Sequence, residues 1–77
     1  MIRSSRTRLM QAERIVRRLS SCDKNQVVFF DHKGALDSCV AGSERHVAMM
    51  NSVDFVRRVV GVFSPGVSAA MILSEAF

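Results

Sequence analysis

Near the start of the chain, apolar residues recur every three or four positions, which is the period of an amphipathic helix. The pattern predicts a helix over residues 4–20, with Ser4 or Ser5 as the N-cap. The small polar residues of "SSCDKN" at 20–25 favour a turn and should end this helix. Its predicted inward-facing stripe consists of Ile2, Leu9, Ala12, Val16 and Leu19.

The next segment, "QVVFFDHKGALDSCV" at 26–40, has the pattern of a β-hairpin. Asp31 favours a turn, and Gly34 can take the positive φ that a three- or four-residue loop needs. One register pairs Phe30 with Ala35; a shift of one residue is the alternative and reverses the faces. Because "VVFF" is apolar on both sides in either register, it predicts a strand buried on both faces, and the more polar "ALDSCVAG" predicts an edge strand.

A second helix is predicted to begin after Ser43, the expected N-cap, and to run to about residues 61–63. Glu44 stands in its first turn, where a negative charge suits the helix dipole. Its apolar stripe follows steps of four and three residues. The stripe consists of Met49, Val53, Val56, Val60 and Phe63.

The last part of the chain is almost wholly apolar. Ser64 followed by Pro65 has the form of an N-cap and a first helical residue, so a third helix is predicted over the rest of the chain. The sequence therefore predicts one small α+β domain over residues 1–77, in the order α-β-β-α-α, with a hairpin packed against helices.

A sheet of two short strands has too little area to bury the apolar faces of three helices. At 48% hydrophobic residues, the chain is also apolar for its 77-residue length. We therefore expect a homodimer whose second copy completes the sheet or packs on the last helix; the alternative is a monomer with helices on both faces of the hairpin. The residues expected to mediate self-association are Val27, Val28, Phe29, Phe30, Met71 and Ile72.

Positive charge is concentrated at the start of the chain. Residues 1–18 contain six arginines and one acidic residue, whereas the rest contains five basic and six acidic residues. Such an asymmetry predicts attraction to phosphate or to an acidic protein surface. The candidate partner-binding or phosphate-binding residues are Arg3, Arg6, Arg8, Arg14, Arg17 and Arg18.

Side chains able to carry chemistry are few and scattered. Cys22, His32, Cys39 and His46 make a nominal Cys2His2 set, but they contain no close pair of the kind that zinc sites use. The four glycines form no phosphate-binding loop. We therefore expect no enzyme activity, no metal or other cofactor, and no small-molecule substrate.

The apolar run at 59–74 is shorter than the about 20 residues that a membrane span needs, and Gly61, Pro65 and Gly66 interrupt it. The start of the chain lacks the apolar stretch of a signal peptide. With its two cysteines expected as free thiols, the chain is interpreted as cytoplasmic and not membrane-bound.

Two functions fit these patterns. The first is a small regulatory or inhibitor-type protein that binds an acidic protein partner through the arginine-rich helix. The alternative is a protein that binds the backbone of duplex nucleic acid through the same helix. The chain has no Trp or Tyr, and its five Phe lie in apolar patterns, so stacking on bases is not expected.

Overall fold

A computed structural model describes residues 5–77 of the chain. It confirms the α+β class and the predicted succession of a helix, two strands and further helices, and it adds a third strand. The elements are α1 (Ser5–Cys22), β1 (Gln26–Phe30), β2 (Leu36–Val40), α2 (Glu44–Met50), α3 (Phe55–Arg58), β3 (Val59–Phe63) and α4 (Ala69–Ala76).

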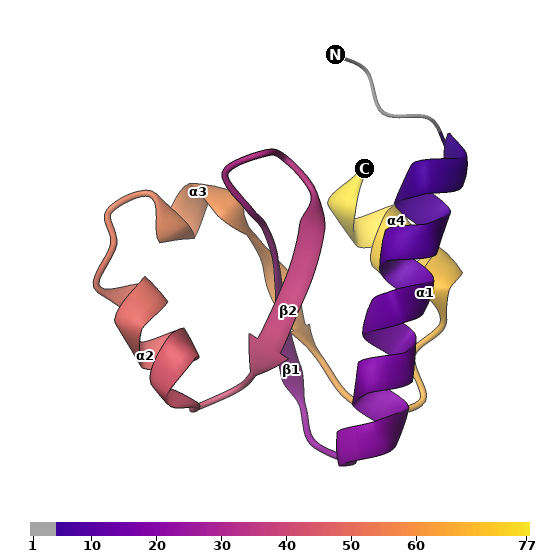
Figure 1. Ribbon diagram of the computed structural model, residues 1–77, viewed down its shortest axis with the longest axis horizontal. Helices are drawn as coiled ribbons and strands as arrows, with labels where there is room; N and C mark the ends of the chain where they lie inside the picture. Colours follow the sequence, from indigo (N-terminus) through magenta and orange to yellow (C-terminus); the bar gives the residue numbers. More distant parts are fainter. Residues whose placement is uncertain (1–4) are drawn as a thin grey trace.

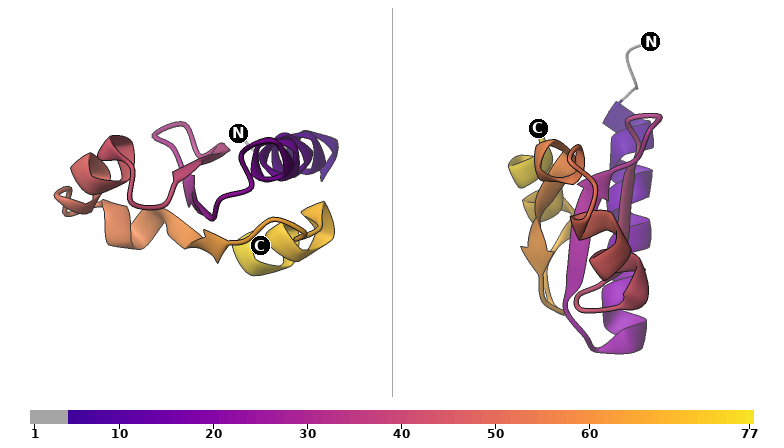
Figure 2. Two further views of the ribbon diagram at one scale, coloured as in Figure 1. Left: turned by 90° about the horizontal axis from the view of Figure 1, so that it is seen from below. Right: turned by 90° about the vertical axis from the view of Figure 1, so that its left-hand side faces the viewer.

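The three strands form one antiparallel sheet in the order β2-β1-β3, so β1 is the middle strand. Helices α1 and α4 cover one face of this sheet, and α2 and α3 lie on the other (Figure 1). The described chain is flat, about 31 × 31 × 15 Å. As Figure 2 shows, β2 and β3 lie toward opposite broad sides of this slab.

Two hydrophobic clusters fill the space on either side of β1. Val28 faces the cluster under α1 and α4, which includes Ile15, Leu19 and Ile72. Val27 and Phe29 face the cluster under α2 and α3, with Cys39 and Phe55. The prediction that β1 is buried on both faces is therefore confirmed, as is the position of β2 at an edge.

Local signals in the loops also act as predicted. Asp31 Oδ1 accepts hydrogen bonds from the Lys33 and Ala35 amides, at 2.8 and 2.9 Å, and Gly34 takes a φ of 80°. Ser43 caps α2 by accepting a hydrogen bond from the His46 amide. The observed hairpin register is the alternative one, because Phe30 pairs with Leu36 and the loop spans residues 31–35.

The predicted long second helix is wrong. Helix α2 ends at Met50, residues 51–54 form turns, and α3 has a single turn before β3 begins at Val59. Val53 and Val56, which the stripe placed inward, are 90% and 78% exposed. The segment "VVGVF" pairs with β1 instead, since β-branched residues fit a strand better than a helix.

The last helix begins later than predicted. Pro65 and Gly66 form a turn, and Gly66 has a φ of 98°, which no helical residue adopts. Ser68 is the N-cap of α4 and accepts a hydrogen bond from the Met71 amide at 3.2 Å.

Candidate functional site

The arginine-rich helix α1 packs on the sheet through a stripe of Ala12, Ile15 and Leu19, each at most 1% exposed. The predicted stripe was partly wrong, because Leu9 is 43% exposed and Ile15 takes the inward position. The stripe's Ile2 lies outside the described residues.

Two of the candidate arginines are engaged by the fold itself. The Arg8 guanidinium lies over the ring of Phe77, 4.1 Å from its centroid, and Phe77 in turn meets Phe30 edge-on. Arg18 donates a hydrogen bond to Asp37 at 2.6 Å in an ion pair that ties α1 to β2. These two side chains stabilise the fold. Arg3 lies outside the described residues.

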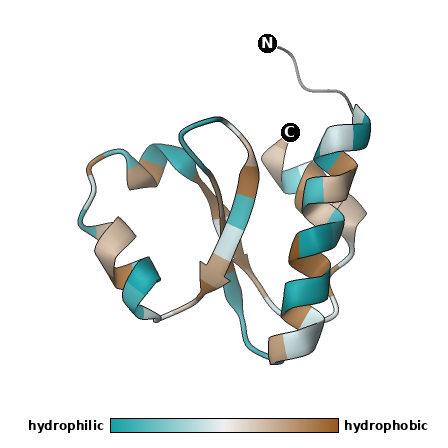
Figure 3. Ribbon diagram, in the orientation of Figure 1, coloured by the Kyte–Doolittle hydropathy of each residue, from teal (hydrophilic) through white to brown (hydrophobic). Residues whose placement is uncertain are grey.

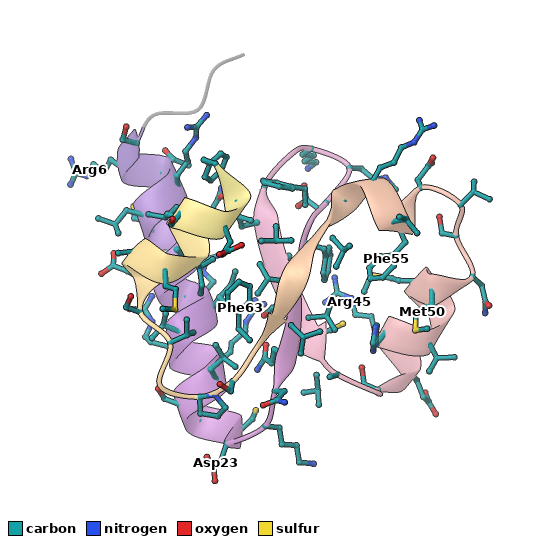
Figure 4. The ribbon with its side chains drawn as sticks, turned by 180° about the vertical axis from the view of Figure 1, so that it is seen from behind. Arg6, Asp23, Arg45, Met50, Phe55 and Phe63 are labelled. Atoms are coloured by element: carbon teal, nitrogen blue, oxygen red, sulfur yellow. The ribbon has the colours of Figure 1, made fainter. Side chains whose placement is uncertain are left out.

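The other three arginines, Arg6, Arg14 and Arg17, are exposed and form no ion pair with any residue that the structure describes. At 3.6 residues per turn they point away from the stripe that faces the sheet, and Arg6 and Arg17 share one direction about three turns, or about 16 Å, apart. Arg6 extends from the start of α1 into solvent (Figure 4). Exposed Leu9 and Met10 lie between these arginines along the helix.

These five residues, Arg6, Leu9, Met10, Arg14 and Arg17, are called the arginine face below. Polar and apolar residues alternate along the whole of α1, as the colouring of Figure 3 shows. The arginine face therefore places three cationic groups around two apolar side chains, and exposed Glu13 is an acidic neighbour on the same side of the helix.

Beside this face, Asp37 on β2 binds two arginines. Its Oδ1 accepts from Arg18 and its Oδ2 accepts from Arg45 at 3.1 Å, while the Ser38 amide donates to Oδ1 at 2.8 Å. Partial burial raises the pKa of Asp37, but the hydrogen bonds from Arg18, Ser38 and Arg45, with the charge of Arg18, outweigh burial and hold the pKa below its ordinary value. Asp37 is therefore ionised at neutral pH.

A small cleft lies between α1 and the hairpin, with a volume of about 160 Å³. Arg14 and Arg18 line it from the helix, and Asp31 and Asp37 from the hairpin. Its charges are thus of both signs, so it offers no single-sign site for a phosphate or a cation.

The residues expected to mediate self-association lie in different environments. Val27, Val28 and Phe29 are buried inside the protomer, and both edges of β1 are paired within the chain, so β1 offers no free edge to a second copy. Phe30 is half-buried against Phe77. Ile72 is fully buried in the core, whereas Met71 is 57% exposed.

The potentially reactive side chains are not brought together. Cys22 is exposed at the end of α1, and Cys39 is buried on β2, where burial raises the pKa of its thiol despite the nearby charge of Arg45. His46 accepts a hydrogen bond from the Gly42 amide at 2.9 Å. Within residues 5–77, no group of three or more His, Cys, Asp or Glu side chains could hold a metal ion.

Among the helices of the described chain, none has the length and apolar character needed to cross a bilayer. The chain matches no protein-family model, no curated protein and no solved structure.

Proposed function

We propose that this protein acts by binding rather than by catalysis, as a small regulatory or inhibitor-type protein whose arginine face docks on an acidic surface of a protein partner. The observation that carries this proposal is the set of three arginines around exposed Leu9 and Met10 that form no ion pair with any residue in the described part of the chain. Arginine and methionine are both enriched in protein interfaces, where the apolar side chains form a core and the charges a rim.

A nucleic-acid backbone is the alternative partner, and two observations make it the weaker one. Arg8 and Arg18 are held by Phe77 and Asp37, which reduces the number of guanidinium groups available to phosphates. Exposed Leu9 and Met10 would also lie against a charged backbone without an apolar partner. An acidic protein surface with apolar side chains satisfies both halves of the arginine face.

We also propose that the protein acts as a homodimer in a reducing compartment such as the cytoplasm. Large apolar side chains, including Val62 and Met71, stay exposed in the protomer, which supports burial against a second copy. Cys22 and Cys39 are free thiols, which fits a reducing compartment.

The binding proposal is tested with two variants that each remove two positive charges. The first changes Arg6 and Arg17 to Gln, and the control changes exposed Lys24 and Arg57 to Gln. The probe is an amphipathic acidic peptide that carries Glu and Leu, with affinity measured by fluorescence anisotropy. We expect the first variant to lose about 1–2 kcal/mol, or about 5- to 30-fold in Kd, and the control to lose less than about 2-fold.

A mixed-sequence DNA duplex is titrated in parallel at low and physiological salt. If the duplex binds more tightly than the peptide, and its log K falls steeply between about 50 and 200 mM salt, the nucleic-acid function replaces the proposed one. Equal affinity of both variants for the peptide would show that the arginine face is not the binding surface.

A further inference from the structure

The sheet has two edge strands, β2 and β3, and they differ in how far their outward backbone groups are hydrogen-bonded. On β2, side chains and a turn bond four of the outward backbone groups. The Leu36 amide donates to Gln11 Oε1 at 3.1 Å, and the Ser38 amide donates to Asp37 Oδ1. Arg18 donates to the Ser38 carbonyl oxygen at 3.4 Å.

The last outward carbonyl of β2 is also used, since the Val40 oxygen accepts from the Ser43 amide at 3.1 Å. A strand from another molecule would have to displace these partners, so the β2 edge is blocked. The Asp37 charge acts in the same direction, because charged residues on an edge strand disfavour pairing.

The β3 edge has none of these protections in the part of the chain that the structure describes. Residues 59–63 contain no charge and no proline. Figure 4 shows β3 on the near side of the molecule with no other element in front of it. Uncharged, apolar edge strands pair readily with another strand, and proteins normally avoid leaving them open.

The hydrogen-bond pattern identifies the free backbone groups. Asp31 and Asn25, which flank β1, bond to Ala35 and Ala41 on the β2 side. In an antiparallel ladder the residues then alternate, so Gln26 and Val28 turn toward β3. Their partners are Phe63 and Gly61, which leaves the N–H and C=O of Val62, between them, directed outward.

Apolar side chains continue beside this edge. Val62 is 58% exposed and Met71 is 57% exposed, and both line an open cavity of about 390 Å³ together with Phe63 and Pro65. Strand pairing at Val62 would therefore bury apolar surface as well as satisfy backbone groups.

We infer that a second copy of this chain pairs antiparallel with β3 near Val62, giving a six-stranded sheet in the order β2-β1-β3-β3-β1-β2. This inference rests on the homodimer part of the proposed function and moves its interface from β1 to β3. A second copy brings an identical uncharged edge, so charge does not oppose pairing in this orientation. The strand itself is neutral, and antiparallel pairing places Arg58 of each copy on opposite sides of the centre, more than about 20 Å apart at about 3.3 Å per residue.

The blocked β2 edges limit this assembly to two copies. In a dimer, the edges left at the ends of the sheet are the two β2 strands, on which the outward Leu36 amide, both outward groups of Ser38 and the Val40 carbonyl are already bonded. The association therefore closes instead of continuing into a fibre.

Light scattering of three proteins at one concentration tests the inference. The wild type should have twice the protomer mass of 8.6 kDa. Val62→Lys places a charge on the open edge and should reduce the mass to 8.6 kDa with an unchanged circular dichroism spectrum. Val53→Lys adds the same charge at a 90% exposed valine outside the sheet and should leave the dimer intact.

A monomeric wild type would overturn both the inference and the homodimer proposal. A wild-type dimer that persists in Val62→Lys would overturn the inference alone, and a mass above that of a dimer would overturn the claim that β2 is blocked. Crosslinking covers the case in which Val62→Lys does not fold. In a Cys22→Ser background, Val62→Cys should form a covalent dimer with a short thiol-specific crosslinker, whereas Val53→Cys should not.

Discussion

The ion pairs of Asp37 give the sharpest prediction about stability. Changing Asp37 to Asn removes the carboxylate charge while keeping the size of the side chain. It weakens the contacts to Arg18 at 2.6 Å and to Arg45 at 3.1 Å. Arg18 and Arg45 are 41% and 56% exposed, so each pair is a partly screened surface ion pair, although Asp37 itself is only 26% exposed.

Partly screened ion pairs of this kind each contribute about 0.2–1 kcal/mol to the free energy of unfolding. The upper part of that range applies here because Asp37 is mostly covered. The expected loss at pH 7 is therefore about 1–2 kcal/mol. In a domain of this size, such a loss lowers Tm by about 5–15 °C. The matched control is Asp54→Asn, an exposed aspartate whose side chain forms no cap hydrogen bond, and it should change stability by less than about 0.5 kcal/mol.

The contribution of Asp37 to the free energy of unfolding depends on pH. The folded pKa of Asp37 lies below its ordinary value of 3.8, so its contribution to stability is fully present above about pH 4 and is lost as the pH falls through the folded pKa. Urea unfolding of wild type and Asp37→Asn between pH 7 and pH 2 measures this. Equal stability at pH 7, or a difference that stays constant down to pH 2, would refute the assignment of Asp37 as an ionised partner of both arginines.

Three further outcomes are expected. Ile15→Ala should lower the free energy of unfolding by about 2–5 kcal/mol because Ile15 is 1% exposed. Leu9→Ala, at a 43% exposed site, should lower it by less than about 1 kcal/mol. A larger loss for Leu9→Ala in urea titrations would mean that α1 is wrongly rotated. Ser68→Ala removes the N-cap of α4 and should cost about 1 kcal/mol, seen as a lower thermal midpoint. Cys22 should react with a thiol reagent in the native protein, and Cys39 should react only on unfolding. Fast labelling of both cysteines in the native protein would contradict the burial of Cys39 and the raised pKa of its thiol.

The parts of the fold that the sequence predicts correctly are those set by local chemistry. The hairpin turn depends on the Asp31 side chain and the positive φ of Gly34, and the start of α2 depends on the Ser43 hydroxyl. Each of these interactions joins residues within a few positions of one another. Such short-range signals are visible in the residue types themselves.

The errors come from long-range contacts. Val60 and Phe63 fit the period of the preceding helix, and only pairing with β1, far earlier in the chain, makes them part of a strand. Leu9 and Ile15 lie on overlapping stripes of α1, and the sheet decides which one is buried.

The candidate site was predicted in outline only. The arginine-rich helix could be identified from its composition. The contacts of Arg8 with Phe77 and of Arg18 with Asp37 could not be predicted, because both partners lie far away in the sequence. The exposed Val62 at an open edge was missed together with β3 itself. The signal that could have found it is the uncharged, β-branched run "VVGVF".

The proposed function places the binding partner on the arginine face of α1. Titration of the isotope-labelled protein with the amphipathic acidic peptide, followed by amide chemical shifts, locates the contact directly. If the partner binds there, the largest shifts occur along α1 at Arg6, Met10, Arg14 and Arg17, with little change at exposed Val53. Shifts confined to α2 and α3, or no shifts along α1 at saturating peptide, would contradict it.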